Sequence, residues 1–173
     1  MANIVHAEFV IGGSEEARKV FLNTTRFVKK ERSKELREDL TLVSGFFNGF
    51  IAPREGKEID LDKLKKDKYT KKDYPAISEL TLAQKTKLLD CSVQVYTEYD
   101  EDTIIHEIYN KGRLTKMEKK TKAELDAMDY VAKLYQKKLE KKGRWRFGLT
   151  KEDYDLAKQC IEEAEKKYGV KLK

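Results

Sequence analysis

Residues 121–139 read TKAELDAMDYVAKLYQKKL, and residues 150–169 read TKEDYDLAKQCIEEAEKKYG. The first stretch opens with a capping box, Thr121 to Glu124, and Thr150 is the N-cap residue predicted for the second. Apolar residues then recur at spacings of 3, 4, 3 and 4 in both stretches, which is typical of amphipathic helices. The predicted stripes are Leu125, Met128, Ala132, Tyr135 and Leu139, then Tyr154, Ala157, Ile161, Ala164 and Tyr168. Because a loop of about seven residues joins the two helices, we expect them to pack antiparallel, with the second ending at Gly169.

The residues at the start of the chain predict a strand followed by a helix. Residues 4–11 alternate between apolar and polar side chains, which indicates a strand that Gly12-Gly13 ends. Ser14 is a good N-cap residue for the helix that follows. We expect this helix to continue into a basic segment that reaches Lys34, and its predicted core residues are Val20, Phe21, Thr24, Phe27 and Val28.

The dipeptide Asn48-Gly49 is the strongest short-range hairpin signal in the chain, because it favours type I′ turns. It predicts that a strand over residues 40–47 turns here and returns until Pro53 ends it. Residues 54–78 are charged and turn-rich, which predicts an exposed connection with at most a short helix. A helix of about three turns is expected from Ser78 or Thr81. The residues that it is expected to bury are Leu82, Leu88, Leu89 and Cys91.

Residues 93–99 alternate as a strand, and after an acidic turn we expect residues 104–109 to return as a second strand. A short helix that stops at Gly112 is the alternative for the returning segment. Together these patterns predict an α+β fold: a small antiparallel or mixed sheet with packed helices and a C-terminal antiparallel helical hairpin. Residues 1–114 form the predicted α+β body. Residues 115–173 form the helical hairpin, packed on or extending the body as one structural unit.

Charge dominates the composition. Charged side chains make up 39% of the 173 residues, and the formal net charge is +6. This excess favours an acidic partner, although 29 of the 37 basic residues are lysine and phosphate-reading proteins often use more arginine. A chain rich in lysine and poor in proline is typical of AT-rich genomes, which favours a phage- or plasmid-type accessory protein.

The two cysteines and the N-terminal residues indicate the cellular compartment in which the chain is expected. Cys91 and Cys160 belong to no CxxC or Cys/His cluster, which excludes a zinc site and is typical of reduced thiols inside a cell. The first residues lack the positive start and the apolar run of a signal peptide, and no stretch reaches the about 18 apolar residues of a membrane span. We therefore expect a cytoplasmic chain that has no membrane partner and no cofactor.

Seven basic side chains and one acid lie within residues 137–151, together with the only tryptophan. Such cations can neutralise phosphates, and the aromatic ring can stack on a base or on a partner. The predicted nucleic-acid or partner-binding residues are Lys133, Lys137, Lys138, Lys141, Lys142, Arg144, Trp145, Arg146 and Phe147. In the alternative interpretation, Trp145 folds inward to close the helical hairpin and the lysines complement the helix dipole. A second basic run covers residues 111–122.

Acidic side chains gather in residues 98–107. Glu98, Asp100 and Asp102 are the candidate ligands for a divalent cation, because carboxylates on neighbouring strands hold Mg²⁺ in two-metal nucleases. The pattern lacks the spaced lysine that such a nuclease requires, so no metal is predicted. An ordinary charged turn and a docking patch for a basic protein are the alternatives.

Three classes of function follow from these patterns. The favoured one is a non-enzymatic binding protein whose basic, aromatic-tipped surface engages nucleic acid or a nucleoprotein complex. The alternatives are a protein–protein inhibitor or adaptor that docks on a host enzyme, and a small metal-dependent nuclease. The absence of a coherent set of catalytic residues in the sequence weighs against an enzyme.

Overall fold

The computed structural model describes residues 4–53, 59–143 and 150–172 of the chain. The chain forms two compact units, Met1–Lys119 and Lys120–Lys173. Its strands are β1 (Ile4–Gly12), β2 (Lys29–Arg37), β3 (Leu40–Asn48), β4 (Ser92–Glu98), β5 (Thr103–Asn110) and β6 (Arg113–Thr121). The helices of the first unit are α1 (Glu15–Asn23), α2 (Leu61–Leu64), α3 (Tyr74–Ser78) and α4 (Leu82–Leu88).

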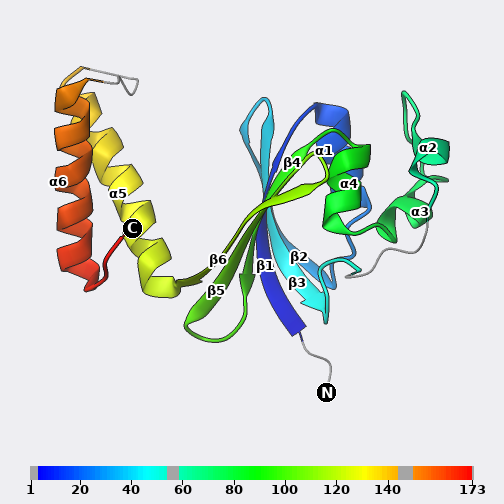
Figure 1. The fold of residues 1–173 in the computed structure, drawn as a ribbon, viewed down its shortest axis with the longest axis horizontal. Helices are drawn as coiled ribbons and strands as arrows, with labels where there is room; N and C mark the ends of the chain where they lie inside the picture. The colour runs from blue at the N-terminus through cyan, green and yellow to red at the C-terminus, as the bar shows by residue number, and fades with distance from the viewer. Residues whose placement is uncertain (1–3, 54–58, 144–149, 173) are drawn as a thin grey trace. The chain divides into compact units, whose positions relative to one another are not determined.

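The strands form one six-stranded sheet in the order β2-β3-β1-β4-β5-β6. β1 is antiparallel to β3 on one side and to β4 on the other, so Phe9 lies opposite both Val43 and Val95. β2 extends the sheet beyond β3, and β5 extends it beyond β4, again antiparallel. Helices α1 and α4 both lie on one side of the sheet (Figure 1). The predicted α+β fold with packed helices is therefore confirmed, and the sheet is antiparallel.

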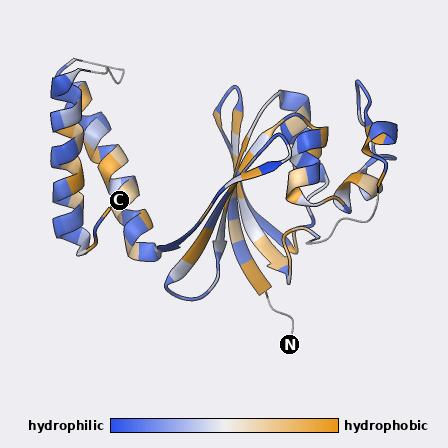
Figure 2. Cartoon of the chain, viewed as in Figure 1, coloured by the Kyte–Doolittle hydropathy of each residue, from blue (hydrophilic) through white to orange (hydrophobic). Residues whose placement is uncertain are grey.

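A hydrophobic core lies between the sheet and its helices. Alternate residues of β1 point into it, and Ala7, Phe9 and Ile11 are fully buried, as the alternation predicts. The Phe9 ring meets Phe21 of α1 and Phe47 of β3 edge-on, at centroid distances of 6.2 and 5.6 Å. Figure 2 shows the contrast between the largely hydrophobic β1 and the hydrophilic β6. The core therefore sits on the central strands and leaves the edge strands polar.

Helix α1 is shorter than predicted, and the basic segment after it is a strand. The helix begins at the predicted N-cap residue, Ser14, but ends at Asn23 with Thr24 as its C-cap. The Thr24 and Thr25 hydroxyls donate back to the carbonyls of the last turn, at 2.7 and 2.6 Å, which competes with helix continuation. The backbone N–H of Val28 then bonds to β3, and β2 follows with exposed side chains along its whole length. The prediction of a helix up to Lys34 is wrong.

The hairpin prediction at Asn48-Gly49 is also wrong. Gly49 does adopt a positive φ of 82°, but residues 50–53 form no strand. β3 instead forms a hairpin with the strand that precedes it, through a turn at residues 38–39, and pairs with β1 along its other edge. Both edges of β3 are therefore occupied, so no returning strand can pair with it.

The second basic run, residues 111–122, contains strand β6. A two-residue turn joins it to β5, with positive φ at Lys111 (46°) and Gly112 (94°), as a type I′ hairpin turn requires. The strands predicted on either side of the acidic turn are confirmed as β4 and β5. Helix α4 begins as predicted, after Thr81, which forms a capping box with Gln84, but its seven residues make about two turns instead of three.

The second unit consists of α5 (Lys122–Lys141) and α6 (Lys151–Tyr168), packed side by side (Figure 1). Thr121 and Thr150 each form the predicted N-terminal cap, and Gly169 ends α6 with a left-handed φ of 66°. The Tyr130 hydroxyl donates to Glu163 across the pair at 3.0 Å, and the Tyr130 ring lies 5.8 Å from that of Tyr168. The predicted C-terminal helical hairpin is confirmed.

The inward faces of α5 and α6 differ from the predicted stripes. Met128 is 45% exposed and Tyr154 is 60% exposed, although both were expected to face the partner helix. The buried residues are Ala127 and Leu139 in α5, and Asp153, Leu156, Cys160 and Ala164 in α6. The Asp153 carboxylate, which is buried, accepts a hydrogen bond from the Thr150 hydroxyl at 2.7 Å. None of the helices in the described parts of the chain is long and apolar enough to span a membrane.

Candidate functional site

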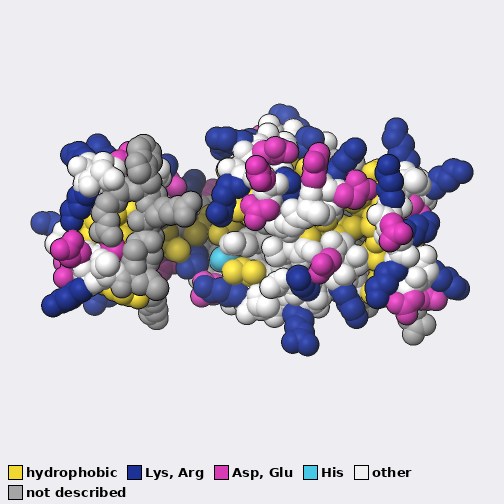
Figure 3. Space-filling model, turned by 90° about the horizontal axis from the view of Figure 1, so that it is seen from above, with side chains coloured by type: hydrophobic (Ala, Val, Ile, Leu, Met, Phe, Trp, Pro, Cys, Tyr) yellow, Lys and Arg dark blue, Asp and Glu magenta, His cyan; other side chains and the backbone are white. Residues whose placement is uncertain are grey.

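The predicted basic residues lie at the C-terminal end of α5. Lys133, Lys137, Lys138 and Lys141 belong to the helix itself, and Lys142 is its C-cap. The other predicted binding residues, Arg144, Trp145, Arg146 and Phe147, lie outside the described residues. On the face of the molecule shown in Figure 3, lysine and arginine side chains are interspersed with acidic ones.

Local acids engage two of these five lysines. Lys133 Nζ lies 2.5 Å from Asp129 Oδ2, and this hydrogen bond is the main cause that raises the pKa of Lys133. Lys138 is half-buried and reaches across to α6, where its Nζ lies 3.4 Å from Glu163 Oε2. The Lys138 contact joins the two helices, whereas the Lys133 contact lies within α5, and both lysines are less available to a ligand.

The remaining three lysines, Lys137, Lys141 and Lys142, are exposed, and we refer to them as the α5 basic end. Lys137 and Lys141 are four residues apart and therefore project from the same face of the helix. Leu139, between them, is buried, which fixes the rotation of α5 and holds the two lysines outward. The position at a helix C-terminus also suits cations, because the backbone carbonyls there carry partial negative charge.

Two of the three candidate metal ligands, Asp100 and Glu98, are engaged in other contacts. Asp100 Oδ1 accepts from the backbone N–H groups of Asp102 (3.0 Å) and Thr103 (2.7 Å), which lowers the pKa of the Asp100 carboxyl. Glu98 Oε1 lies 3.1 Å from His6 Nδ1. Over the described ranges, no group of three or more His, Cys, Asp and Glu side chains is placed to hold a metal ion. The acidic run forms an Asx-type turn between β4 and β5.

The first unit contains a pocket that the sequence analysis did not predict. It has a volume of about 450 Å³ and lies where the segment after α1, the end of β3 and helices α3 and α4 meet. The described residues that line it are Thr24, Arg26, Phe27, Val28, Asn48, Phe50, Ile51, Ala52, Pro53, Ser78 and Lys85. Polar and apolar atoms contribute comparable parts of this wall, and its two charged members among the described residues are both cations. We refer to it as the Lys85 pocket.

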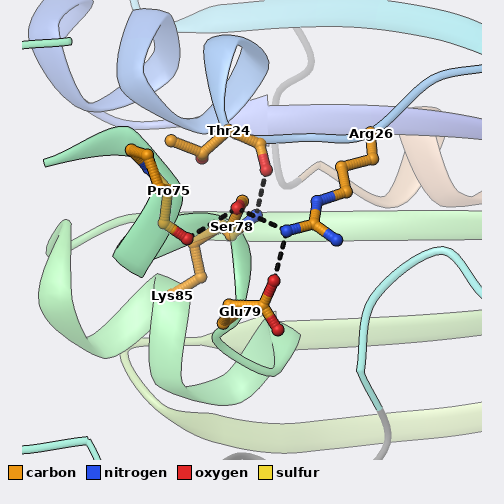
Figure 4. Close-up of polar contacts among 6 residues, drawn as sticks. All are labelled: Thr24, Arg26, Pro75, Ser78, Glu79 and Lys85. Atoms are coloured by element: carbon orange, nitrogen blue, oxygen red, sulfur yellow. Dashed lines mark hydrogen bonds and ion pairs between the residues drawn. The ribbon is translucent and has the colours of Figure 1, made fainter. Parts of the chain in front are cut away.

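Lys85 is a buried cation, with only 2% of its surface exposed. Its Nζ donates to the backbone carbonyl of Thr24, the C-cap of α1, at 3.1 Å (Figure 4). It also lies 5.2 Å from the centroid of the Phe21 ring. Desolvation lowers the pKa of Lys85 to about 8, and the positive charge of Arg26 contributes in the same direction. The neighbouring Cys91 is buried as well, and desolvation raises the pKa of its thiol to about 12.

Arg26 approaches the same place from the segment between α1 and β2. Its guanidinium donates to the Glu79 carboxylate and, at 3.1 Å, to the Ser78 hydroxyl (Figure 4). The Ser78 hydroxyl in turn donates to the carbonyl of Pro75 at 2.8 Å, which fixes its orientation. The Arg26 side chain is 68% exposed, so it lies at the mouth of the pocket while Lys85 lies at its buried end.

The sequence held one signal for this site. Lys85 lies three residues after Leu82 and three before Leu88, so it falls on the apolar face of α4 that was predicted to be buried. A lysine in such a stripe is unusual, because charged side chains are rarely buried without a partner. Nothing in the sequence linked it to Thr24 or Arg26, which lie about sixty residues earlier in the chain.

Comparison of the chain with models of protein families, with curated proteins and with solved structures gives no match. Function is therefore inferred from the residues of this chain, their placement and their chemistry.

Proposed function

We propose that this chain is a non-enzymatic binding protein that engages nucleic acid, alone or within a nucleoprotein complex, through the α5 basic end. The observation that supports this proposal is the exposure of three lysines, Lys137, Lys141 and Lys142, on one end of a helix whose rotation the buried Leu139 fixes. Cations that neutralise phosphates release condensed counterions, and this release provides much of the affinity for nucleic acid.

The sequence that follows strengthens the proposal. Arg144, Trp145, Arg146 and Phe147 come directly after the α5 basic end and add two cations and two aromatic rings. Arginine binds phosphate oxygens with two parallel hydrogen bonds, and aromatic rings stack on unpaired bases. Single-stranded nucleic acid is therefore the form that this combination suits best.

The composition favours a particular origin and cellular compartment for the protein. We take the lysine-rich, proline-poor chain to be a phage- or plasmid-type accessory protein that acts on a nucleic-acid complex of its host. Its two cysteines are buried and free, which fits a reducing compartment such as the cytoplasm.

Fluorescence anisotropy with labelled single-stranded and double-stranded oligonucleotides, at several salt concentrations, tests the proposal. The variant replaces Lys137, Lys141 and Lys142 with glutamine. Its matched control replaces three exposed lysines of α6 and the tail, Lys158, Lys166 and Lys171, and so removes the same charge elsewhere on the second unit.

We expect the wild-type chain to bind the single strand with an affinity that falls steeply as salt rises. The basic-end variant is expected to reduce the log–log slope by about one for each phosphate that it no longer neutralises, while the control keeps the slope. Equal losses of affinity in both variants would reduce the effect to net charge and contradict the proposal. An absence of binding even at low salt would also contradict it and would favour the alternative, an inhibitor or adaptor that docks on a protein. Magnesium-dependent loss of the oligonucleotide would favour a nuclease instead.

A further inference from the structure

The Lys85 pocket holds positive charge that its own walls do not balance. Lys85 and Arg26 both line it, and no carboxylate is found among the described residues of its lining. The Arg26 guanidinium has one carboxylate partner, Glu79, while Lys85 has no acid within 4 Å in the described part of the chain. Burial of a cation without a counter-charge is costly, so this arrangement calls for an explanation.

The hydrogen bonds of Lys85 leave donors unused. A lysine ammonium has three N–H donors, and in the described ranges Lys85 Nζ has one acceptor, the carbonyl of Thr24 at 3.1 Å. That carbonyl caps the C-terminus of α1, so the contact also places the cation at the negative end of a helix dipole. The Phe21 ring, at 5.2 Å, covers the ammonium without accepting a conventional hydrogen bond.

We propose that the Lys85 pocket binds a small organic monocarboxylate with an apolar body, and that the Lys85 ammonium and the Arg26 guanidinium hold its carboxylate. The two oxygens of a carboxylate match the unused donors of the two cations. Phe27, Val28 and Ile51 line the rest of the pocket and offer apolar contact to the body of the ligand. This site is independent of the α5 basic end, which lies in the other compact unit.

The size and chemistry of the pocket favour this class of ligand over others. A volume of about 450 Å³ falls within the range of small-molecule sites, which are typically apolar with a few convergent polar groups. An organic cation would meet two positive charges, and the one carboxylate beside them, Glu79, is already paired with Arg26. A phosphate dianion is usually held by several backbone N–H groups or arginines, whereas one lysine and one arginine match a single negative charge.

Benzoate serves as the probe, with benzamide as its uncharged analogue and benzylamine as its cationic analogue. Each is titrated into the full chain and followed by NMR of methyl groups, in particular those of Val28 and Ile51 in the pocket wall. We expect benzoate to shift these signals to saturation, and the two analogues to bind about tenfold more weakly or worse, because they lack the charge that the cations recognise.

Three variants locate the interaction. Lys85→Met is expected to weaken benzoate binding about tenfold or more. Lys87→Met removes an exposed lysine of the same helix and is expected to leave binding unchanged. Arg26→Gln alters a side chain that is 68% exposed, so it is expected to fold normally and to weaken binding by a smaller factor. This variant keeps the proposal testable even if Lys85→Met does not fold.

Failure of benzoate to saturate the pocket signals at millimolar concentration would overturn the proposal. Equal binding of benzamide and benzoate would overturn it as well, because charge would then play no part. Unchanged benzoate affinity in both Lys85→Met and Arg26→Gln would also overturn the proposal. Lys85 would then serve only to cap α1. Oligonucleotide binding by the Lys85→Met variant is expected to equal that of the wild type, which separates this site from the proposed function.

Discussion

Replacing Lys85 with methionine is expected to change how the free energy of unfolding depends on pH. The pKa of Lys85 is lowered from 10.5 to about 8 in the folded chain, chiefly by desolvation. In the unfolded chain the same ammonium is solvated and keeps its ordinary pKa. Between these two pKa values the unfolded state binds more protons than the folded state, so the stability of the wild type rises with pH across this window.

The magnitude follows from the difference between the two pKa values. At pH 7 the lysine is protonated in both states, and holding its charge inside the protein costs about 3 kcal/mol. This cost is fully present below pH 8, declines as pH rises, and has gone above pH 10.5. Between pH 7 and pH 10 the wild type is therefore expected to gain roughly 2–3 kcal/mol relative to a variant that has no titrating group at this position.

Urea unfolding at several pH values between 7 and 10 measures this effect. Lys85→Met keeps the length and apolar stem of the side chain and removes the charge. It also removes the hydrogen bond to Thr24, which adds an offset to the difference in free energy of unfolding between the two proteins. The predicted signal is therefore the change of this difference with pH, and not its absolute size. Other groups with shifted pKa values, such as Tyr109, contribute equally to both proteins and cancel in the difference. The variant Lys87→Met, on the exposed side of α4, keeps Lys85, so its free energy of unfolding is expected to follow that of the wild type at every pH.

A difference between wild type and Lys85→Met that stays constant with pH would refute this reasoning. It would mean that the charge of Lys85 is fully compensated in the folded chain. A wild type that loses stability relative to Lys85→Met as pH rises would refute it more strongly, because the folded state would then favour the protonated lysine. The titratable groups whose charge acts on Lys85 are Arg26, which is paired with Glu79, and Cys91, whose thiol pKa burial raises to about 12.

Three further predictions concern stability and reactivity. Gly45→Ala is expected to lower the free energy of thermal unfolding by about 2 kcal/mol or more, because the new Cβ would lie 2.5 Å from the backbone carbonyl oxygen of Lys29 in β2. Gly49→Ala is expected to lower it by about 1 kcal/mol, because Gly49 has a positive φ but open space around its Cα. Arg18→Met is expected to cost about 3 kcal/mol in urea unfolding, since buried Arg18 donates to the Thr41 hydroxyl and to two backbone carbonyls; a loss below 1 kcal/mol would contradict this role. The buried thiols of Cys91 and Cys160 are expected to resist alkylation at pH 8 until urea unfolds the chain, because burial raises both pKa values.

The starts of four helices were predictable because their signals are local, whereas α2 and α3 lie in a stretch that was expected to hold at most a short helix. Ser14, Thr81, Thr121 and Thr150 each accept a hydrogen bond from a backbone N–H two or three residues ahead, and this contact needs no tertiary partner. The strands of the core were predictable for a related reason. β1 and β4 have one buried face and one more polar face, so burial alone imposes the period of two that the sequence displays.

Strand β2 could not be predicted, because nothing in it is buried. All of its nine residues are exposed, so no apolar period distinguishes it from a charged helix. The turn at Asn48-Gly49 failed for the opposite reason. The local turn chemistry is present, but pairing partners are chosen over the whole sheet, and β3 already pairs with β1 and β2.

The two proposed binding sites differ in the same way. The α5 basic end is a run in the sequence, and the structure places its lysines on one helix end, as expected for residues within a turn or two of each other. The Lys85 pocket joins residues 24–28, 48–53, 78 and 85, which only the folded chain brings together. The only sign of this pocket in the sequence was Lys85, a lysine on the predicted apolar face of α4.

The exposure of β2 also has a consequence for how this protein can vary. β2 contributes backbone hydrogen bonds to β3, while its side chains lie in solvent along its length. Selection on folding therefore acts there on the peptide groups and scarcely on side-chain identity, apart from excluding proline where an N–H is needed. A mutational scan would find broad tolerance across β2 beside intolerance at β3, its immediate neighbour. Related proteins could diverge in this strand until no sequence comparison identified it, while the sheet itself stayed unchanged.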